Sequence, residues 1–281
     1  MNKDCLFFVF ILSVILCFLA IFFLIPSILV LYTSVKVIRE TNVHLVYKII
    51  AHVLTTADFF YIKIYCHSFI ISLSTLFFTV ILGCPFAYFV YCIKNKFLQQ
   101  IFLISIIIPF WTSSLIRTYS IIFLLRTNGV VNKLLLMFGI ITEPLDLLYN
   151  FTSIIIGFTY TLIPFIIIPV YLSLIKIKGN IIEAAKDLGA NDLQVFTLIL
   201  LPLSYSAIIS GGSVVFLAST SMFYLSDILG GSKYNLISNL IKNKFLVSYN
   251  WNTACFISLI FYIFVIFSFF LQKKTLELEL E

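Results

Sequence analysis

Long apolar stretches alternate with short polar segments along most of the chain. A helix needs about 18 consecutive apolar residues to cross a bilayer, and each stretch reaches that length. We expect six membrane-spanning helices, at about residues 5–32, 66–92, 101–125, 151–173, 203–225 and 251–271. The first stretch is too long for the core of a signal peptide and has no small-residue cleavage site after it, so we interpret it as a retained span.

The overall composition agrees with a membrane protein. Hydrophobic residues make up 62% of the 281 residues and charged residues only 11%, whereas about 25% of a soluble chain is charged. The mean hydropathy is +1.13. We therefore predict an all-α integral membrane protein whose residues 1–281 form a single transmembrane domain. Proline residues inside three of the predicted spans would bend them; these are Pro109, Pro164 and Pro169. The pair Gly211–Gly212 would let helices pack closely.

The connections between the spans are mostly polar. Residues 33–63 and 226–250 are predicted loops. Apolar pieces within residues 126–150 are too short to cross a membrane, so we expect a surface helix there, followed by a turn at Glu143–Pro144.

The connection at residues 174–202 carries unusually complete helix signals. Asn180 is a candidate N-cap, and Glu183 then falls at the third helical position, as in a capping box. Gly189 suits the position just past a helix end. Asn191 or Asp192 can cap a second helix that leads to Pro202. These signals predict a helix–turn–helix in water. They leave open whether it is an ordinary connection or a docking element.

Several kinds of chemistry are not expected. The chain has no phosphate-binding G-x-x-x-x-G-K-[ST] loop. Its six cysteines and three histidines lack metal-ligand spacing. No Ser/His/Asp or Cys/His arrangement indicates catalysis. The net charge is +6, but there is no run of basic residues that would bind nucleic acid. We predict a non-enzyme without a metal or cofactor of its own, whose surroundings are membrane lipid.

One motif identifies a family. Glu183, Ala184 and Ala185 are followed after three residues by Gly189, and after nine more by Ile199-x-Leu201-Pro202. This spacing resembles the signature of permease subunits in binding-protein-dependent ABC importers. The resemblance implies the type I (MetI-like) permease fold. It also implies that these seven residues couple the chain to an ATPase, with the short helix seated in a groove of that subunit.

The resemblance implies partners and an orientation as well. A second permease subunit would complete a heterodimer, two cytoplasmic ATPase subunits would bind ATP and Mg²⁺, and a periplasmic binding protein would deliver the solute. The loop at 174–202 and both termini would be cytoplasmic, in a bacterial inner membrane. Lysine and arginine divide almost equally between the two sides of the membrane, so the positive-inside rule does not decide the orientation.

Three further stretches, at residues 109–135, 159–174 and 222–245, resemble permeases of spermidine/putrescine importers (the PotB type). A polyamine path requires carboxylates and aromatic faces, because both attract ammonium groups. The candidates are Asp227, Tyr224, Tyr160, Trp111 and Tyr119. Asp227 is alternatively an interfacial or helix-capping residue, or a partner for Arg117. Arg117 would repel a polycation, so we assign it a structural role.

Two other functions remain as alternatives. The same importer architecture could carry another small solute, such as an anion or a metal chelate; Asp227 argues against an anion. A channel or secondary transporter that works without an ATPase would leave the 183–202 motif unexplained.

Overall fold

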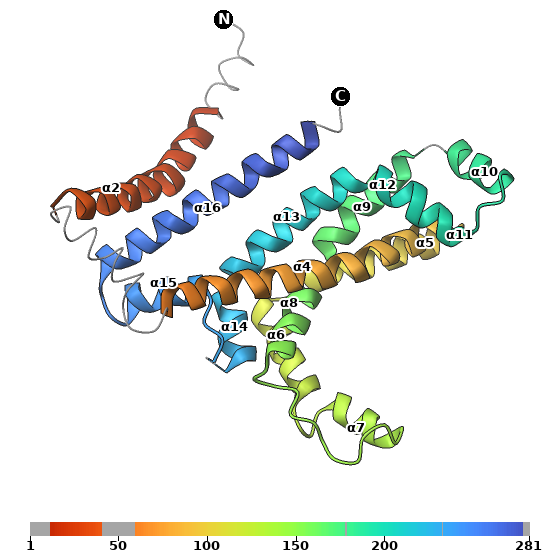
Figure 1. Ribbon diagram of the computed structural model, residues 1–281, viewed down its shortest axis with the longest axis horizontal. Coiled ribbons are helices and arrows are strands. Elements are labelled where there is room, and N and C mark those ends of the chain that lie inside the picture. Colours follow the sequence, from red (N-terminus) through yellow and green to blue (C-terminus); the bar gives the residue numbers. More distant parts are fainter. Residues whose placement is uncertain (1–11, 41–59, 178, 232, 278–281) are drawn as a thin grey trace, which may run out of the picture. The chain divides into compact units, whose positions relative to one another are not determined.

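The computed structural model describes residues 12–40, 60–177, 179–231 and 233–277, and within these ranges it is helical without a strand. In chain order the elements, with η for a π-helical turn, are η1 (Ala20–Leu24), α2 (Ile25–Glu40), α4 (Phe60–Cys92), α5 (Lys96–Trp111), α6 (Ser114–Leu125), α7 (Val130–Met137), α8 (Phe151–Leu162), α9 (Pro164–Lys176), α10 (Gly179–Asp187), α11 (Asp192–Gln194), η2 (Val195–Leu200), α12 (Leu201–Leu203), α13 (Tyr205–Ser221), α14 (Phe223–Gly230), α15 (Ile237–Leu246) and α16 (Trp251–Glu277) (Figure 1). They belong to two compact units. Unit 1 comprises residues 1–62 and 240–265, and unit 2 comprises residues 63–239 and 266–281.

Unit 1 contains the first predicted span. Helical structure begins with the first described residues and continues past the predicted end at residue 32 to Glu40; residues 5–11 of this prediction lie outside the described ranges. The large apolar side chains of this helix are exposed, for example Phe22 at 67%, which suits contact with lipid. A cavity of about 260 Å³ lies between α2 and the first part of α16, where Pro26 and Tyr262 are among its lining residues.

Unit 2 has its core along α4, α8, α9, α13 and α14. Fully buried apolar side chains are concentrated on α8 and α9, with Phe158 and Ile166 at 0% exposure. Two helices, α9 and α13, pack along each other at Gly211. A Cβ atom at Gly211 would lie 2.5 Å from the carbonyl oxygen of Phe165. The predicted close approach at this glycine is therefore confirmed.

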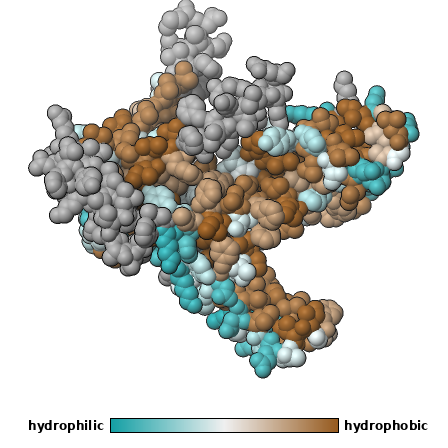
Figure 2. Space-filling model, in the orientation of Figure 1, coloured by the Kyte–Doolittle hydropathy of each residue, from teal (hydrophilic) through white to brown (hydrophobic). Residues whose placement is uncertain are grey.

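Much of the surface remains apolar. Figure 2 shows hydrophobic side chains over large parts of the visible face, with hydrophilic patches at the ends of helices and in loops. Large apolar residues are strongly exposed in the helical segments, among them Phe97 at 67% and Phe123 at 65%. A water-soluble protein rarely exposes so continuous an apolar surface, whereas a membrane protein turns it toward lipid.

Three predicted spans are broken or bent. The stretch at 101–125 is divided into α5 and α6, because Thr112 has an extended backbone conformation and Ser113 is not helical either. Pro109, which cannot donate a backbone hydrogen bond, stands in the last turn before this break. The stretch at 151–173 bends by 42° between α8 and α9, where Pro164 begins the second helix. The predicted bend at Pro164 is thus confirmed.

The stretch predicted at 203–225 ends earlier than expected. Met222 has a non-helical conformation and separates α13 from α14. The prediction of a loop at 226–250 is therefore wrong in part: α14 extends to Gly230, and α15 follows from Ile237 to Leu246. Asp227 consequently lies on a separate short helix and not at the end of a continuous span.

The number of spans is not confirmed as six. Within the described residues three helical segments are long and apolar enough to cross a membrane: Leu12–Lys36, Lys63–Cys92, and Ser114–Met137, which includes the turn between α6 and α7. The count rises to five if each of two bent pairs, α8 with α9 and Asp192–Leu203 with α13, is one span. Two further apolar segments, α5 (Lys96–Trp111) and the part of α16 from Trp251 to Ile266, are each shorter than the length required.

Candidate functional site

The segment from Gly179 to Leu203, here called the coupling segment, contains the family motif. Its first helix, α10, begins at Gly179. The prediction that Asn180 caps this helix from outside is therefore wrong, since Gly179 and Asn180 are both helical and Glu183 comes two residues later than the third helical position. In Figure 1, α10 and α11 lie at the end of unit 2 where α4 ends and α5 begins.

The end of α10 is closed by hydrogen bonds. The backbone N–H of Gly189 donates to Lys186 O at 2.9 Å, and that of Ala190 donates to Ala185 O at 3.0 Å. This pair of bonds is the Schellman arrangement, in which the first of the two donor residues, just past the helix end, adopts a left-handed conformation. Gly189 supplies it with φ +88°. The predicted helix end at Gly189 is confirmed.

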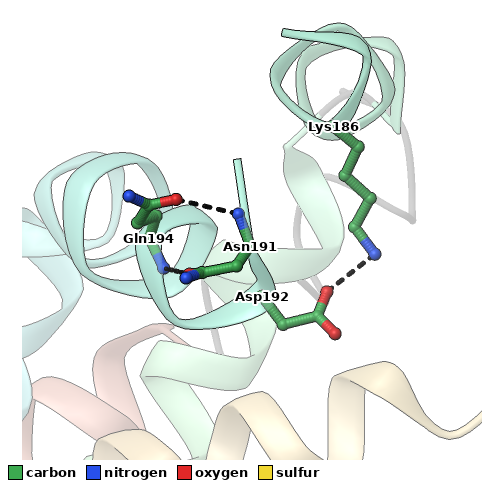
Figure 3. Close-up of polar contacts among 4 residues, drawn as sticks. All are labelled: Lys186, Asn191, Asp192 and Gln194. Carbon is green, nitrogen blue, oxygen red and sulfur yellow. Dashed lines mark hydrogen bonds and ion pairs between the residues drawn. The ribbon is translucent and has the colours of Figure 1, made fainter. Parts of the chain in front are cut away.

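The second helix is capped from within the turn. Asn191 accepts a hydrogen bond at its side-chain oxygen from Gln194 N at 2.8 Å, and Gln194 Oε1 accepts one from Asn191 N at 2.9 Å (Figure 3). Of the two predicted caps, the structure therefore selects Asn191. A 2.7 Å ion pair joins Lys186 of α10 to Asp192 of α11. The hydrogen bond and the negative charge of Asp192 raise the pKa of Lys186, so this amine is charged at neutral pH.

The two faces of α10 differ. Ile182, Ala185 and the following Ala190 are half-buried against the core of unit 2. Ile181, Ala184 and Leu188 are exposed and recur at helical spacing, which makes an apolar stripe on the outer surface. Leu188 is 90% exposed. An apolar stripe on a short capped helix between charged residues marks a surface that another protein can cover.

The seven motif residues divide between these two faces. In the first helix and at its end, Glu183, Ala184 and Gly189 lie at the surface, whereas Ala185 is half-buried. In the second helix Ile199 and Leu201 are half-buried and Pro202 is exposed. The motif thus combines residues that hold the segment on unit 2 with residues that a partner could contact.

The second helix of the coupling segment changes geometry before it reaches α13. It passes through the π-helical turn η2 and bends by 71° at Ser204. Tyr88 of α4 packs on Phe196 of η2, with ring centroids 4.9 Å apart. π-Helical turns are frequent at functional sites, and this one connects the coupling segment to a membrane helix.

Replacing Gly189 by alanine is expected to loosen the end of α10. Alanine must adopt φ +88° there, which costs about 1–2 kcal/mol. Nothing lies within 4 Å of the added Cβ, so the cost is conformational. Hydrogen exchange of the Gly189 and Ala190 amides should accelerate, and ATPase association should weaken. Gly139→Ala is the matched control, because Gly139 has φ +67° and equally open surroundings outside the coupling segment. Equal weakening of association by both substitutions would contradict the expectation.

The candidate residues for a solute path lie at different places. Tyr224 and Asp227 stand three residues apart on the half-exposed face of α14. Tyr160 lines a largely apolar cavity of about 450 Å³ beside Phe78, and Trp111, 88% exposed, lines a different cavity with residues of α5. Tyr119 is 62% exposed on α6. In the described part of the chain, the five residues are therefore not gathered into one pocket, and their role stays a prediction.

The surroundings of Arg117 agree with a structural role. Its guanidinium carbon lies 5.2 Å from the ring centroid of Phe110, a cation–π contact. This contact crosses the break between α5 and α6. Phe110 in turn packs edge-on against Phe165 of α9.

Asp227 has a partner that the sequence analysis missed. Asn239 of α15 is fully buried, and its Nδ2 donates to Asp227 Oδ1. Asn132 of α7 is also fully buried, and its Nδ2 donates to the carbonyl oxygens of Arg126 and Leu145. These hydrogen bonds stabilise the connection at residues 126–145. Both asparagines lie among apolar residues in short helices. No local signal distinguishes them from exposed asparagines, because their partners lie 6 to 13 residues away and on other elements.

Comparison with known proteins is consistent with this geometry. The chain is 34% identical over 272 residues to the spermidine/putrescine transport system permease protein PotB of Haemophilus influenzae, which covers 96% of this chain and 95% of that protein. It is 35% identical over 233 residues to PotB of Escherichia coli, covering 83% and 84%.

A solved structure shares the fold. A bacterial alginate ABC transporter, in complex with an alginate pentasaccharide-bound periplasmic protein, superposes with a TM-score of 0.77 at 17% identity, covering 96% of this chain and 93% of that chain. At this identity the likeness concerns the fold alone, which is that of an ABC importer permease. The expected fold class is thus confirmed.

The family model described as "Binding-protein-dependent transport system inner membrane component" matches residues 79–276, which include the whole coupling segment. Together with the apolar helices, this match indicates a multi-pass protein of the inner membrane that is a subunit of a transport system. The chain belongs to the binding-protein-dependent transport system inner membrane component family.

Proposed function

We propose that this chain is the permease subunit of an ATP-driven importer for polyamines such as spermidine and putrescine. The identity to PotB over nearly the whole chain supports the cargo. One observation carries the ATP-driven mechanism: α10 is capped at its end and presents an apolar stripe to the outside, with Leu188 90% exposed.

The coupling segment would connect the membrane helices to a cytoplasmic ATPase. A short helix is marginally stable alone, and the Schellman end, the Asn191 cap and the Lys186–Asp192 pair together give this one a defined shape. A defined shape lets it transmit a movement of the ATPase. Glu183, Ala184 and Gly189 would contact that subunit. Ala185, Ile199 and Leu201, which are half-buried, would hold the segment on unit 2, and the exposed Pro202 precedes the bend at Ser204. Through unit 2 the motion would reach α13 as rigid-body alternating access.

This role determines the proposed orientation and partners. An ATPase is cytoplasmic, so the coupling segment and both termini would be cytoplasmic too. ATP and Mg²⁺ would bind to two ATPase subunits, a second permease subunit would complete a heterodimer, and a periplasmic protein would deliver the polyamine. The chain itself would form one transmembrane domain over residues 1–281 and would bind no cofactor.

Asp227 is the proposed cation-attracting group of the solute path. Its carboxylate and the ring of Tyr224 occupy neighbouring positions on one half-exposed face of α14. The interaction of an ammonium group with the face of an aromatic ring contributes about 0.5–2 kcal/mol of binding free energy. The same ammonium group can form an ion pair with a carboxylate. Tyr160, Trp111 and Tyr119 are proposed as further aromatic faces along the path, at their separate places in unit 2.

Uptake of labelled spermidine tests the function. Cells without a polyamine importer of their own would express this chain together with its candidate ATPase, second permease and binding protein. We expect ATP-dependent uptake that unlabelled putrescine inhibits and that an anionic solute leaves unchanged.

The assembled complex must be isolated from the same cells. An assembled complex without polyamine uptake would refute the proposed cargo and favour another small solute. Uptake that persists when the ATPase subunit is omitted would refute the proposed coupling.

A further inference from the structure

Buried polar contacts connect the first residues of α15 to α14 and to α4. The Nδ2 of Asn239 donates to Asp227 Oδ1 and, at 3.0 Å, to Ser226 Oγ, both on α14. Two residues earlier on α15, the backbone N–H of Ile237 donates to Ser68 Oγ of α4 at 2.8 Å. Ser68, Ser226 and Asn239 are all at most 1% exposed. The amide of Asn239 therefore has a position fixed relative to both α4 and α14.

The contact orients both of its members. An ionised carboxylate only accepts hydrogen bonds, so the amide must present its NH₂ group, not its oxygen, to Asp227. Ser226 Oγ lies close to both polar atoms of the amide, 3.0 Å from Nδ2 and 3.1 Å from Oδ1, and can accept from the first or donate to the second. The contact with Asp227 therefore decides which way the amide faces, and a hydrogen bond to a charged acceptor is among the stronger ones.

The two partners differ in accessibility. Asn239 is 0% exposed, whereas Asp227 is half-buried. The carboxylate of Asp227 thus accepts a hydrogen bond from a buried amide, while the residue itself is partly exposed on α14, on the same face as Tyr224. A purely structural hydrogen bond would be served equally well by a neutral side chain at position 227. A charge held at an accessible position suits attraction of a cation.

We propose that Asn239 is a positioning residue for transport: it holds the carboxylate of Asp227 in a fixed orientation toward the ammonium groups of a passing polyamine. This inference rests on the proposed polyamine function. It adds that the effect of Asn239 acts through Asp227, and that loss of either residue removes the same contribution.

The test is a double-mutant cycle in the complete importer, reconstituted in liposomes with saturating spermidine-loaded binding protein. Asn239→Leu keeps roughly the side-chain volume and removes the donor. We expect it to slow spermidine uptake by about tenfold, the effect of one lost hydrogen bond to a charged group. Asp227→Asn should slow uptake at least as much. The double variant should be no slower than Asp227→Asn alone, because the two substitutions remove one shared interaction.

Two further variants separate positioning from packing. The exchange Asp227→Asn with Asn239→Asp keeps an amide–carboxylate pair but moves the charge to the buried position. Uptake should stay at the level of Asp227→Asn, and ATP hydrolysis by the complex should be preserved. Ser68→Ala removes the contact between α4 and α15 without touching Asp227. It should slow uptake less than Asn239→Leu does, because the hydrogen bond that is lost joins two neutral groups.

Four results would overturn the inference. They are wild-type uptake by Asn239→Leu, multiplicative effects in the double variant, recovery in the exchange variant, and an effect of Ser68→Ala equal to that of Asn239→Leu. If Asn239→Leu fails to assemble, the exchange variant, which retains the hydrogen-bonded pair, decides between the two roles. Failure of the proposed function has a different signature: the wild-type complex assembles and hydrolyses ATP but takes up no spermidine, and the inference then falls with it.

Discussion

Glu183→Arg is expected to abolish ATP-dependent uptake while the protein still inserts into the membrane. Glu183 is exposed on α10, beside the stripe of Ile181, Ala184 and Leu188, so its replacement leaves the core of unit 2 unchanged. If this surface docks on an ATPase, reversing its charge removes a favourable contact and introduces repulsion. Loss of one partner of an interfacial charge pair costs about 2–5 kcal/mol, which is a large fraction of a typical binding free energy.

Two measurements check this result: spermidine uptake, and the amount of ATPase subunit that copurifies with the permease. Glu143→Arg is the matched control, because Glu143 is equally exposed and the charge change is the same, but the residue lies in the connection between α7 and α8. The control should keep uptake and association. Uptake at the wild-type rate in Glu183→Arg would show that α10 is not the coupling helix.

Gly211→Ala is expected to destabilise the folded permease. The added Cβ would lie 2.5 Å from the carbonyl oxygen of Phe165 and 3.1 Å from Pro169 Cγ. A backbone atom cannot rotate away as a side chain can, so α9 and α13 must separate. Overpacking of this kind costs about 1–3 kcal/mol. The thermal unfolding midpoint and the yield of the purified protein should both fall.

Gly212→Ala is the control for this experiment. Its Cβ would lie 3.0 Å from Leu76 Cδ1, the end of a flexible side chain that can move aside. We expect a smaller change in the unfolding midpoint than for Gly211→Ala. Equal midpoints for the two variants would mean that the contact between α9 and α13 is looser than the structure indicates.

Local signals predicted the coupling segment well. The end of α10 at Gly189 and the cap of α11 at Asn191 were both recognisable, because their hydrogen bonds join residues only three to five positions apart. The start of α10 was predicted two residues too late. A helix start depends on which backbone conformations the first residues adopt, and Gly179 adopts the helical one.

Long-range contacts were not predictable in this way. The role of Gly211 depends on Phe165 of another helix, and that of Asn239 depends on Asp227. Hydrophobicity also failed to indicate where the helices break. Short runs of serine and threonine adjoin both breaks, at 112–114 and 219–221, but hydropathy averaged over a whole span does not show them. The breaks themselves are backbone conformations that apolarity does not encode.

The sequence by itself determined that this is an all-helical membrane protein, and its motif identified the family, because apolar length and short-range capping depend only on neighbouring residues. The tertiary structure decided how the helices are divided, which face of α10 is outward, and that the carboxylate of Asp227 is held by a buried amide on α15. These features depend on contacts between helices that are distant in the chain, so the sequence of any one segment does not determine them.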